Sequence, residues 1–362
     1  MSEQTELWVD RGNLFNTKVV HVDQEPLQDG EIRVAIEKFA LTANNVTYAV
    51  AGDMVGYWQF YPAQDEWGKV PVWGIAEVVE SRLDDIATGE RLYGFLPMVS
   101  HTVLRPGEIS KAQFTDVSVH RSELPLLYNQ YRRTAAEADF LQSMEDERCL
   151  LFPLLATSYL LYDYLLDNDC FNAGQIIIGS ASSKTGLGLA HLLHRDATLS
   201  QRVVALTSAG NRDFVSAQGV YDQVVCYGEE STIDATVAAA YVDMSGDATV
   251  TAAVHNLLQD KLVESCAVGA THWESFGETP ELPGAKPELF FAPAQVQKRD
   301  AQWGVGVVMG KAMAASAETA GHLADSLHIE RIKGADAAAA AWVAMVNNQV
   351  SPQRGLILSL LN

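Results

Sequence analysis

The first third of the chain alternates apolar and polar residues over short stretches. Between residues 18 and 120, the runs KVVHVD, EIRVAIEKFAL, VPVWGIAEVVES and ERLYGFLPMVSHTVL carry β-branched and aromatic residues, and turn signals such as PLQDGE and ATGE separate them. A two-residue period of this kind places one face of each strand in a core. The pattern therefore predicts a mostly β domain, with a turn or short helix over ANNVTYAVAG.

The pattern changes after residue 130. YRRTAAEADFLQSMEDE and LLFPLLATSYLLYDYLLDN have the composition of helices, and short apolar runs then alternate with helical stretches such as GLGLAHLLHRD and TVTAAVHNLLQ. Strands that alternate with helices at this spacing predict a doubly wound parallel sheet. The predicted strands of this sheet are 175–178, 202–207, 223–227, 240–244, 261–268 and 289–292.

The last part of the chain is helical and ends in a strand-like run, RGLILSLL. At roughly 150 residues per domain, 362 residues predict two domains. A terminal strand after an α/β unit returns most naturally to the first domain. We therefore expect a mostly β domain made of residues 1–150 and 310–362, with a doubly wound domain over residues 151–309 inserted in it.

The net charge and the distribution of apolar residues bear on which partners the protein binds and in which compartment it lies. The formal net charge of −21 would repel a phosphate backbone, which argues against sequence-independent binding of nucleic acid. The N-terminus, MSEQTELWVDRGNLF, lacks the basic flank and apolar core of a secretory signal, and no run approaches ~20 apolar residues. We therefore predict a cytoplasmic protein that binds neither nucleic acid nor a membrane.

The stretch QIIIGSASSKTGLGLA, residues 175–190, contains a candidate nucleotide-binding loop. An ATP-binding P-loop needs GxxxxGK followed by Ser or Thr, but Ser183 precedes Lys184 and Ile178 occupies the place of the first glycine. The P-loop interpretation therefore fails at both required glycines. A dinucleotide-binding turn needs a tight exit from the first strand and a helix N-terminus that faces the pyrophosphate, and this loop meets both demands. Its expected cofactor-binding residues are Gly179, Ser180, Ala181, Ser182, Ser183, Lys184, Thr185 and Gly186, while Gly188 lets the helix lie close to the sheet.

The second predicted strand bears on the choice of cofactor. NAD sites usually place an Asp or Glu at its end to bind the ribose hydroxyls, whereas a 2′-phosphate excludes that carboxylate. Here the strand ends in Thr207 and Ser208, followed by Asn211 and Arg212, and no acid occurs before Asp213. The pattern favours NADP(H) over NAD(H). The alternative for Arg212 is a solvated residue at the start of a helix.

With these residues in place, the chain resembles the medium-chain dehydrogenase/reductase superfamily, its zinc-free quinone oxidoreductase-like branch in particular, and it also looks like the uncharacterised DUF2855 family. The resemblance runs over nearly the whole chain, from GEIRVAIEKFALTANNVTYAVAGD through KVPVWGIAEVVES, LLATSYLLYDYL and YVDMSG to RGLILSLL. It implies a GroES-like catalytic domain built from both ends of the chain, a Rossmann domain between them, and a homodimer. The fold class expected is thus α/β.

The chain departs from this superfamily at two places. Its members usually carry a turn of the form AAGGVG, whereas residues 181–186 read ASSKTG, so serine and lysine replace the paired glycines. Zinc alcohol dehydrogenases carry Gly-His-Glu and a catalytic cysteine, whereas residues 74–77 read GIAE and no cysteine precedes Cys149. The cysteines also form no CxxC pair. We therefore expect no metal site.

The resemblance also implies the remaining site residues. Without zinc, a reductase needs hydrogen-bond donors for the developing negative charge. Tyr48 is the preferred donor, and Asn44, Tyr61 and Tyr128 are further candidates; the alternative is that Tyr48 packs in the core with its hydroxyl satisfied. Additional positions that match the family near the dinucleotide are Thr157, Tyr227, Ser245 and Gly269.

These observations predict a zinc-independent, NADPH-dependent oxidoreductase. It would reduce an activated C=C or carbonyl group, of quinone, enone or enoyl type, by hydride transfer, and its substrate would be a small apolar or aromatic molecule. The alternative is a catalytically inactive dinucleotide-binding sensor or structural protein of the same fold.

Overall fold

The computed structural model describes residues 3–269 and 281–361, and the chain divides into two compact units. Unit 1 comprises Met1–Leu150 and Ser326–Asn362, and unit 2 comprises Leu151–Asp325. The first division lies where the sequence predicts it, but the second follows residue 325 instead of residue 309. The reason is helix α10 (Val307–Ala324), which packs on α6 (Lys184–Arg195) and α9 (Ala292–Trp303) within unit 2.

Unit 1 consists mainly of strands, as the alternating pattern predicts. Its strands are β1 (Glu3–Asp10), β2 (Thr17–Asp23), β3 (Ile32–Leu41), β4 (Trp67–Gly68), β5 (Pro71–Ser81), β6 (Arg91–Pro97), β7 (His101–Leu104), β8 (Pro106–Gly107), β9 (Gln113–Asp116), β10 (Gln130–Arg133), β17 (His328–Lys333) and β18 (Arg354–Ser359). The larger sheet has the order β17-β18-β3-β5-β6-β10-β9-β8, with β7 paired to β3, and the smaller sheet has the order β2-β1-β4. Because β18 pairs with β3, the end of the chain completes a sheet begun near its start, as predicted for the closing strand.

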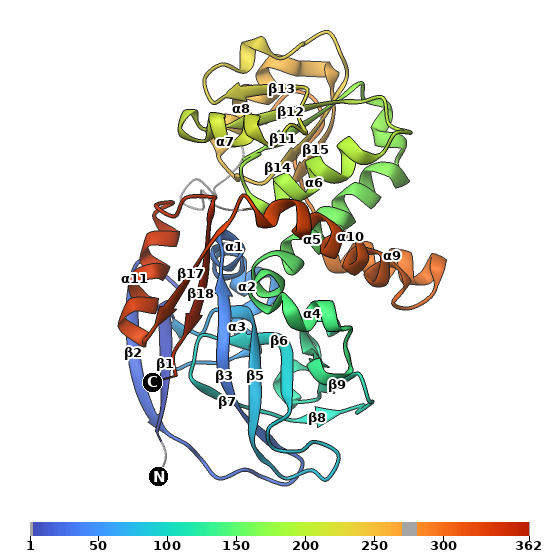
Figure 1. The fold of residues 1–362 in the computed structure, drawn as a ribbon. Coiled ribbons are helices and arrows are strands. Elements are labelled where there is room, and N and C mark those ends of the chain that lie inside the picture. Colours follow the sequence, from blue (N-terminus) through green and yellow to red (C-terminus); the bar gives the residue numbers. More distant parts are fainter. Residues whose placement is uncertain (1–2, 270–280, 362) are drawn as a thin grey trace. The chain divides into compact units, whose positions relative to one another are not determined.

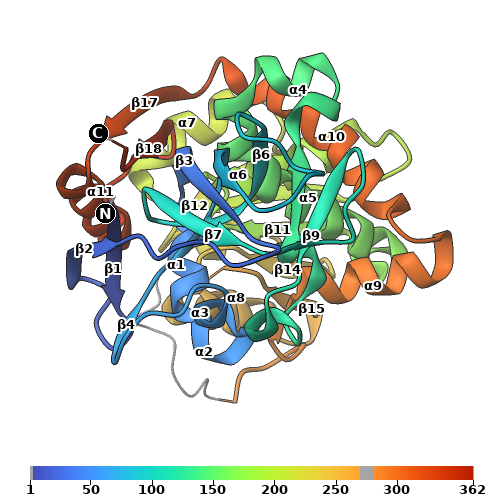
Figure 2. The ribbon, with the colours of Figure 1, turned by 90° about the horizontal axis from the view of Figure 1, so that it is seen from below.

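The helices of unit 1 are short. They are α1 (Ala43–Val50), α2 (Gly52–Val55), α3 (Tyr57–Phe60), α4 (Asp139–Ser143) and α11 (Ala335–Val346). Helix α11 lies beside β1 and β2 in both views (Figures 1 and 2), and the buried Trp342 donates its Nε1–H to the Leu14 carbonyl at 2.8 Å. The last helix therefore covers the first strands.

Two sequence predictions in unit 1 differ from the structure. The run that begins at residue 131 was expected to be helical, but β10 occupies its start, because Tyr131 pairs with Phe114 of β9 and the neighbouring Arg132 with Tyr93 of β6. Strand β17 was not predicted at all. Its sequence, HIERIK, has exposed and half-buried residues only, so it carries no apolar stripe that would mark it as a strand.

Unit 2 contains a doubly wound parallel sheet. Its strands are β11 (Gln175–Gly179), β12 (Arg202–Thr207), β13 (Gln223–Cys226), β14 (Ala239–Asp243), β15 (Leu262–Ala267) and β16 (Glu288–Leu289). They are ordered β13-β12-β11-β14-β15-β16 and are all parallel (Figure 1). This is the 3-2-1-4-5-6 order of dinucleotide-binding folds, in which the connections reverse direction between the first and fourth strands. The predicted sixth strand is shorter than expected, because α9 already begins at Ala292.

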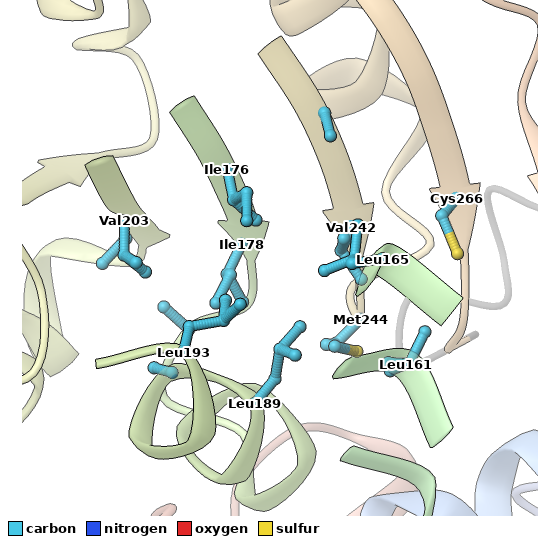
Figure 3. Close-up of a cluster of buried hydrophobic side chains, with 14 of the residues drawn as sticks. Leu161, Leu165, Ile176, Ile178, Leu189, Leu193, Val203, Val242, Met244 and Cys266 are labelled. Carbon is cyan, nitrogen blue, oxygen red and sulfur yellow. The ribbon is translucent and has the colours of Figure 1, made fainter. Parts of the chain in front are cut away.

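Apolar cores lie on both faces of this sheet. On one face, Ile176 and Ile178 of β11 point toward Leu189 and Leu193 of α6 (Figure 3), and α5 (Glu145–Asp167) and α7 (Arg212–Ala217) contribute further residues. On the other face, helix α8 (Ala248–Leu258) packs on β11, β12 and β14. By length and composition α5 could cross a membrane, but most of its apolar stretch is buried, as in a core helix.

Candidate functional site

The loop between β11 and α6 is a tight turn. Ser180 has a φ of +50°, the Ala181 N–H donates to the Leu206 carbonyl at 3.1 Å, and the Ser183 N–H donates to the Ser180 carbonyl at 2.9 Å. The Ser183 hydroxyl then caps α6 by accepting from the Gly186 N–H at 3.1 Å. The small residues SASS therefore let the chain leave the strand and enter a capped helix within a few residues, as predicted.

Two glycines at this loop are required by close contacts. A Cβ atom at Gly179 would stand 2.6 Å from Oδ1 of Asp243, and one at Gly188 would stand 2.5 Å from the Ser158 hydroxyl. Gly188 was expected to bring α6 close to the sheet, but the neighbour it admits is helix α5. Ser158 also donates to the Thr185 carbonyl at 2.8 Å, so the first turn of α6 is tied to α5.

Three residues that follow β12 hold the loop from one side. The Asn211 amide donates to the Ser182 hydroxyl at 3.1 Å, and the Tyr221 hydroxyl donates to the Ala181 carbonyl at 2.9 Å. The Tyr227 hydroxyl bonds to Ser180, and burial raises its pKa. The structure thus brings two of the predicted cofactor residues, Asn211 and Tyr227, to the predicted loop. The contribution of Tyr221 was missed, because no local motif marks it.

The end of β12 presents polar groups. Thr207 is fully buried, and within the described part of the chain its hydroxyl has no hydrogen-bond partner. Ser208 follows it and accepts from the Asn211 N–H through its carbonyl at 3.0 Å. Arg212, the first residue of α7, forms an ion pair with Glu229, its Nη2 lying 2.6 Å from the Glu229 Oε2. Arg212 is thus an exposed residue at the start of a helix, as the alternative has it, and it has a defined partner.

Lys184, the first residue of α6, adds a positive group to the loop. Its side chain is half-buried, and burial lowers its pKa to about 8. An ammonium group with such a pKa is still largely protonated near neutral pH. The helix N-terminus and this lysine together give the loop a positive electrostatic character suited to an anion.

The turn after β14 contains an unexpected buried carboxylate. Asp243 accepts from the Ser245 N–H at 2.7 Å, from the Ser245 hydroxyl at 2.6 Å and from the Gly246 N–H at 3.2 Å, and burial raises its pKa. Its backbone carbonyl also accepts from the Gly269 N–H at 3.3 Å. Ser245 and Gly269, both predicted near the dinucleotide, thus gather around Asp243. The sequence signal was the motif YVDMSG, which pointed to the turn but not to the aspartate.

The remaining predicted cofactor residue, Thr157, lies within α5. Its hydroxyl donates to the Pro153 carbonyl at 3.0 Å, one helical turn earlier. The Thr157 hydroxyl thus bonds back to the backbone of its own helix.

The residues of unit 2 fit a dinucleotide. The tight turn, the N-capped helix, the positive charge at Lys184 and the orphaned buried hydroxyl of Thr207 are donor groups for phosphate and ribose. The loop lies at the reversal of strand order, where open α/β sheets bind ligands beyond the carboxyl ends of the strands.

The predicted catalytic residues lie in an aromatic cluster of unit 1. The Tyr48 and Tyr128 ring centroids are 6.3 Å apart, and the Tyr48 hydroxyl accepts from Trp73 Nε1–H at 3.3 Å and bonds to Asn44. Burial raises the pKa of Tyr48. Tyr48 and Asn44 therefore meet at one hydroxyl group that already has protein partners, whereas Tyr128 contacts the ring of Tyr48. The buried members of this cluster are Tyr48, Tyr57, Phe60, Tyr61, Phe95 and Tyr128.

Tyr61 belongs to the same cluster, but its hydroxyl turns elsewhere. It donates to the Phe95 carbonyl at 2.5 Å and lies 2.7 Å from the Tyr131 hydroxyl. Tyr131 in turn accepts from Arg121, which pairs with Asp116 at 3.3 Å in a fully buried site. This geometry gives Tyr61 a structural role in tying strands together. The Tyr128 hydroxyl contacts that of Tyr57 at 3.1 Å.

No group of three or more His, Cys, Asp or Glu side chains that could hold a metal ion occurs in residues 3–269 and 281–361. At the GIAE segment of β5, Ile75 and Ala76 are fully buried, and the Ile75 side chain offers no metal ligand.

Several solved structures have this fold. CurA from Vibrio vulnificus in complex with NADPH matches with a TM-score of 0.62 over 100% of both chains, at 12% sequence identity. The Etr1p complex with NADP and crotonyl-CoA matches with a TM-score of 0.58 over 99% of this chain and 100% of that one, at 10% identity. The quinone oxidoreductase from Coxiella burnetii matches with a TM-score of 0.52 over 99% and 100%, at 13% identity.

These likenesses confirm the predicted fold class, a GroES-like mostly β domain with a Rossmann domain. No curated protein matches the sequence. One family model, described as a protein of unknown function (DUF2855), matches residues 39–351, which is most of the chain. The chain therefore belongs to the DUF2855 family.

Proposed function

We propose that the protein is an NADP(H)-dependent oxidoreductase that reduces an activated C=C or carbonyl group without zinc. The observation that carries the proposal is the loop between β11 and α6, which lies at the strand-order reversal of a 3-2-1-4-5-6 sheet and is followed by a second strand without a terminal acid. The solved structures of CurA and Etr1p, which share the fold, hold NADPH and NADP.

In this proposal, the chain binds the dinucleotide through two sets of residues. The N-terminus of α6 and Lys184 attract the pyrophosphate, while the buried Thr207 hydroxyl, Ser208, Asn211 and Arg212 approach the 2′-phosphate. Bound NADPH supplies a hydride. The protein's own contribution is to orient the cofactor and to exclude water from it.

The aromatic cluster supplies the hydrogen-bond donors. Tyr48 is the preferred donor to a substrate oxygen, with Asn44 beside it, and the surrounding rings suit a small apolar or aromatic substrate. Burial disfavours the tyrosinate, so Tyr48 stays protonated and keeps a proton to donate.

The alternative is a dinucleotide-binding protein without catalysis. The observation that favours it is that the Tyr48 hydroxyl already bonds to Trp73 and Asn44 in a closely packed cluster. A buried hydroxyl whose hydrogen bonds are made within the protein can have a purely structural role.

The test has two parts. Fluorescence titration of the purified protein with NADPH should show saturable binding, with ATP unable to compete; absence of binding would refute both the oxidoreductase and the sensor. Turnover is then measured with a panel of quinones, enones and aldehydes. NADPH oxidation with any of them supports the reductase, and tight binding without turnover across the panel supports the sensor.

A further inference from the structure

The ion pair between Arg212 and Glu229 joins the ends of two neighbouring strands. Arg212 follows β12 and Glu229 follows β13, and these strands are parallel partners that end together at Thr207 and Cys226. The Arg212 Nη2 and Glu229 Oε2 atoms are 2.6 Å apart, and each side chain is about half exposed, at 46% and 47%. The pair therefore lies on the surface at the carboxyl end of the sheet, where a small molecule can reach it.

Glu229 and the neighbouring Glu230 differ in where their carboxylates lie, and only that of Glu229 reaches the guanidinium of Arg212. Glu230 is buried, and its carboxylate accepts from the Gly228 N–H at 2.9 and 3.0 Å, so its charge is used inside the turn. Glu229 instead directs Oε2 to the guanidinium, with only a long contact of 3.4 Å from the Cys226 N–H. The Glu229 carboxylate thus pairs with Arg212, whereas the Glu230 carboxylate bonds to the backbone of the turn.

This arrangement matters for a dinucleotide. In a sheet of this order, the end of the second strand faces the adenosine ribose, and a basic residue there receives the 2′-phosphate that distinguishes NADP(H) from NAD(H). The guanidinium in this position is already paired with a carboxylate. A 2′-phosphate must displace that carboxylate or share the guanidinium with it, and the two anions repel each other at such distances.

We infer that Glu229 is a specificity-determining residue that competes with the 2′-phosphate for Arg212 and so limits the preference for NADP(H) over NAD(H). The inference rests on the proposed function. An exposed ion pair is weak and can be displaced, so Glu229 reduces NADP(H) binding without preventing it. The affinity for NAD(H), which lacks the 2′-phosphate, does not depend on this competition.

The experiment measures the Kd of NADPH and of NADH by calorimetry for the full-length protein, Glu229→Gln and Arg212→Ala, and for the double variant. Glu229→Gln should bind NADPH about three- to ten-fold more tightly, with NADH changed less than about two-fold. Arg212→Ala should weaken NADPH binding and abolish the gain from Glu229→Gln in the double variant. Melting temperatures verify that each variant folds.

A matched control is Glu318→Gln. Glu318 pairs with Arg195 between α10 and α6 of the same unit with similar exposure, and its removal should leave both Kd values unchanged. If the wild type binds NADPH but Glu229→Gln leaves the ratio of the two Kd values unaltered, the competition is refuted and the proposed function stands. If the wild type binds neither nucleotide, both are refuted.

Discussion

Gly179 and Asp243 are register partners at the ends of β11 and β14, and a Cβ atom at position 179 would stand 2.6 Å from Asp243 Oδ1. The aspartate cannot retreat easily, because Ser245 and Gly246 hold its carboxylate. The first strand can therefore pass the fourth-strand turn only because residue 179 has no side chain. This contact lies where the order of the sheet reverses, next to the proposed pyrophosphate loop.

Gly179→Ala is therefore expected to destabilise unit 2 and to weaken NADPH binding. Forcing a methyl group into this contact should lower the free energy of unfolding by about 1–3 kcal/mol. Gly310→Ala is the control, because a Cβ atom there meets nothing within 4 Å and lies in an exposed part of α10, where alanine stabilises by up to about 1 kcal/mol. Urea denaturation measures both, and equal stability of the two variants would contradict the steric argument.

The loop was predictable because its signals are local. A strand, a run of small residues and glycines at helical spacing lie within 175–190, and NADP(H)-type residues follow the next strand directly. The contact of Gly179 with Asp243 was not predictable, because β11 pairs directly with β14 although β12 and β13 lie between them in the sequence. Likewise, the pair of Arg212 with Glu229 depends on the register of β12 and β13.

The partners of the tyrosine hydroxyls in residues 48–61 could not be predicted either, because they too depend on contacts between segments distant in sequence. From the sequence, Tyr48 is the preferred donor and Tyr61 a further candidate, since both lie in one aromatic stretch. Only the fold separates them, because Tyr61 reaches the Phe95 carbonyl of β6 whereas Tyr48 meets Trp73 of β5. Packing between strands that are distant in sequence decides which partners each hydroxyl has.

Tyr48→Phe should lower kcat by about 10²-fold or more, with the Kd for NADPH unchanged, if its hydroxyl donates a proton in the transition state. Steady-state kinetics with an active substrate, together with an NADPH titration, separate the two effects. Tyr61→Phe is the comparison, because it removes a buried bond to the Phe95 carbonyl and should lower stability by about 1–3 kcal/mol instead. A Tyr48→Phe protein with wild-type kcat would exclude the hydroxyl from the reaction.

If Lys184 binds the pyrophosphate as proposed, NADPH binding should depend on pH. Its pKa, lowered to about 8 by burial, means that the ammonium is charged below about pH 8 and loses its charge above it. If it faces the pyrophosphate, the Kd for NADPH should rise between about pH 7 and 9 in the wild type. Lys184→Met should bind more weakly at pH 7 and show a flat profile, while Lys184→Arg should keep its affinity to higher pH. Parallel profiles for the wild type and Lys184→Met would place the lysine away from the phosphates.

The stacked pair of His191 and His322 should make the stability of unit 2 depend on pH in the acid range. Their rings stack with centroids 5.9 Å apart and an interplanar angle of 7°, and burial, followed by the charges of His322, His194 and Arg195, lowers the pKa of His191 from 6.5 to about 4. The folded protein therefore favours the neutral His191 ring. Its contribution to stability is present above pH 6.5 and is lost as the pH falls toward about 4, because the unfolded chain binds the proton more readily.

His191→Gln should therefore flatten the fall in melting temperature between about pH 6.5 and 4.5, since glutamine keeps a polar side chain but takes up no proton. His328→Gln provides the control, because His328 is exposed on β17 of unit 1 and its replacement should leave the wild-type decline intact. Thermal melts at constant ionic strength across this range measure the slopes. A His191→Gln protein that loses stability as steeply as the wild type would show that the proton enters elsewhere, and the stacked pair would then be a packing contact without a role in acid sensitivity.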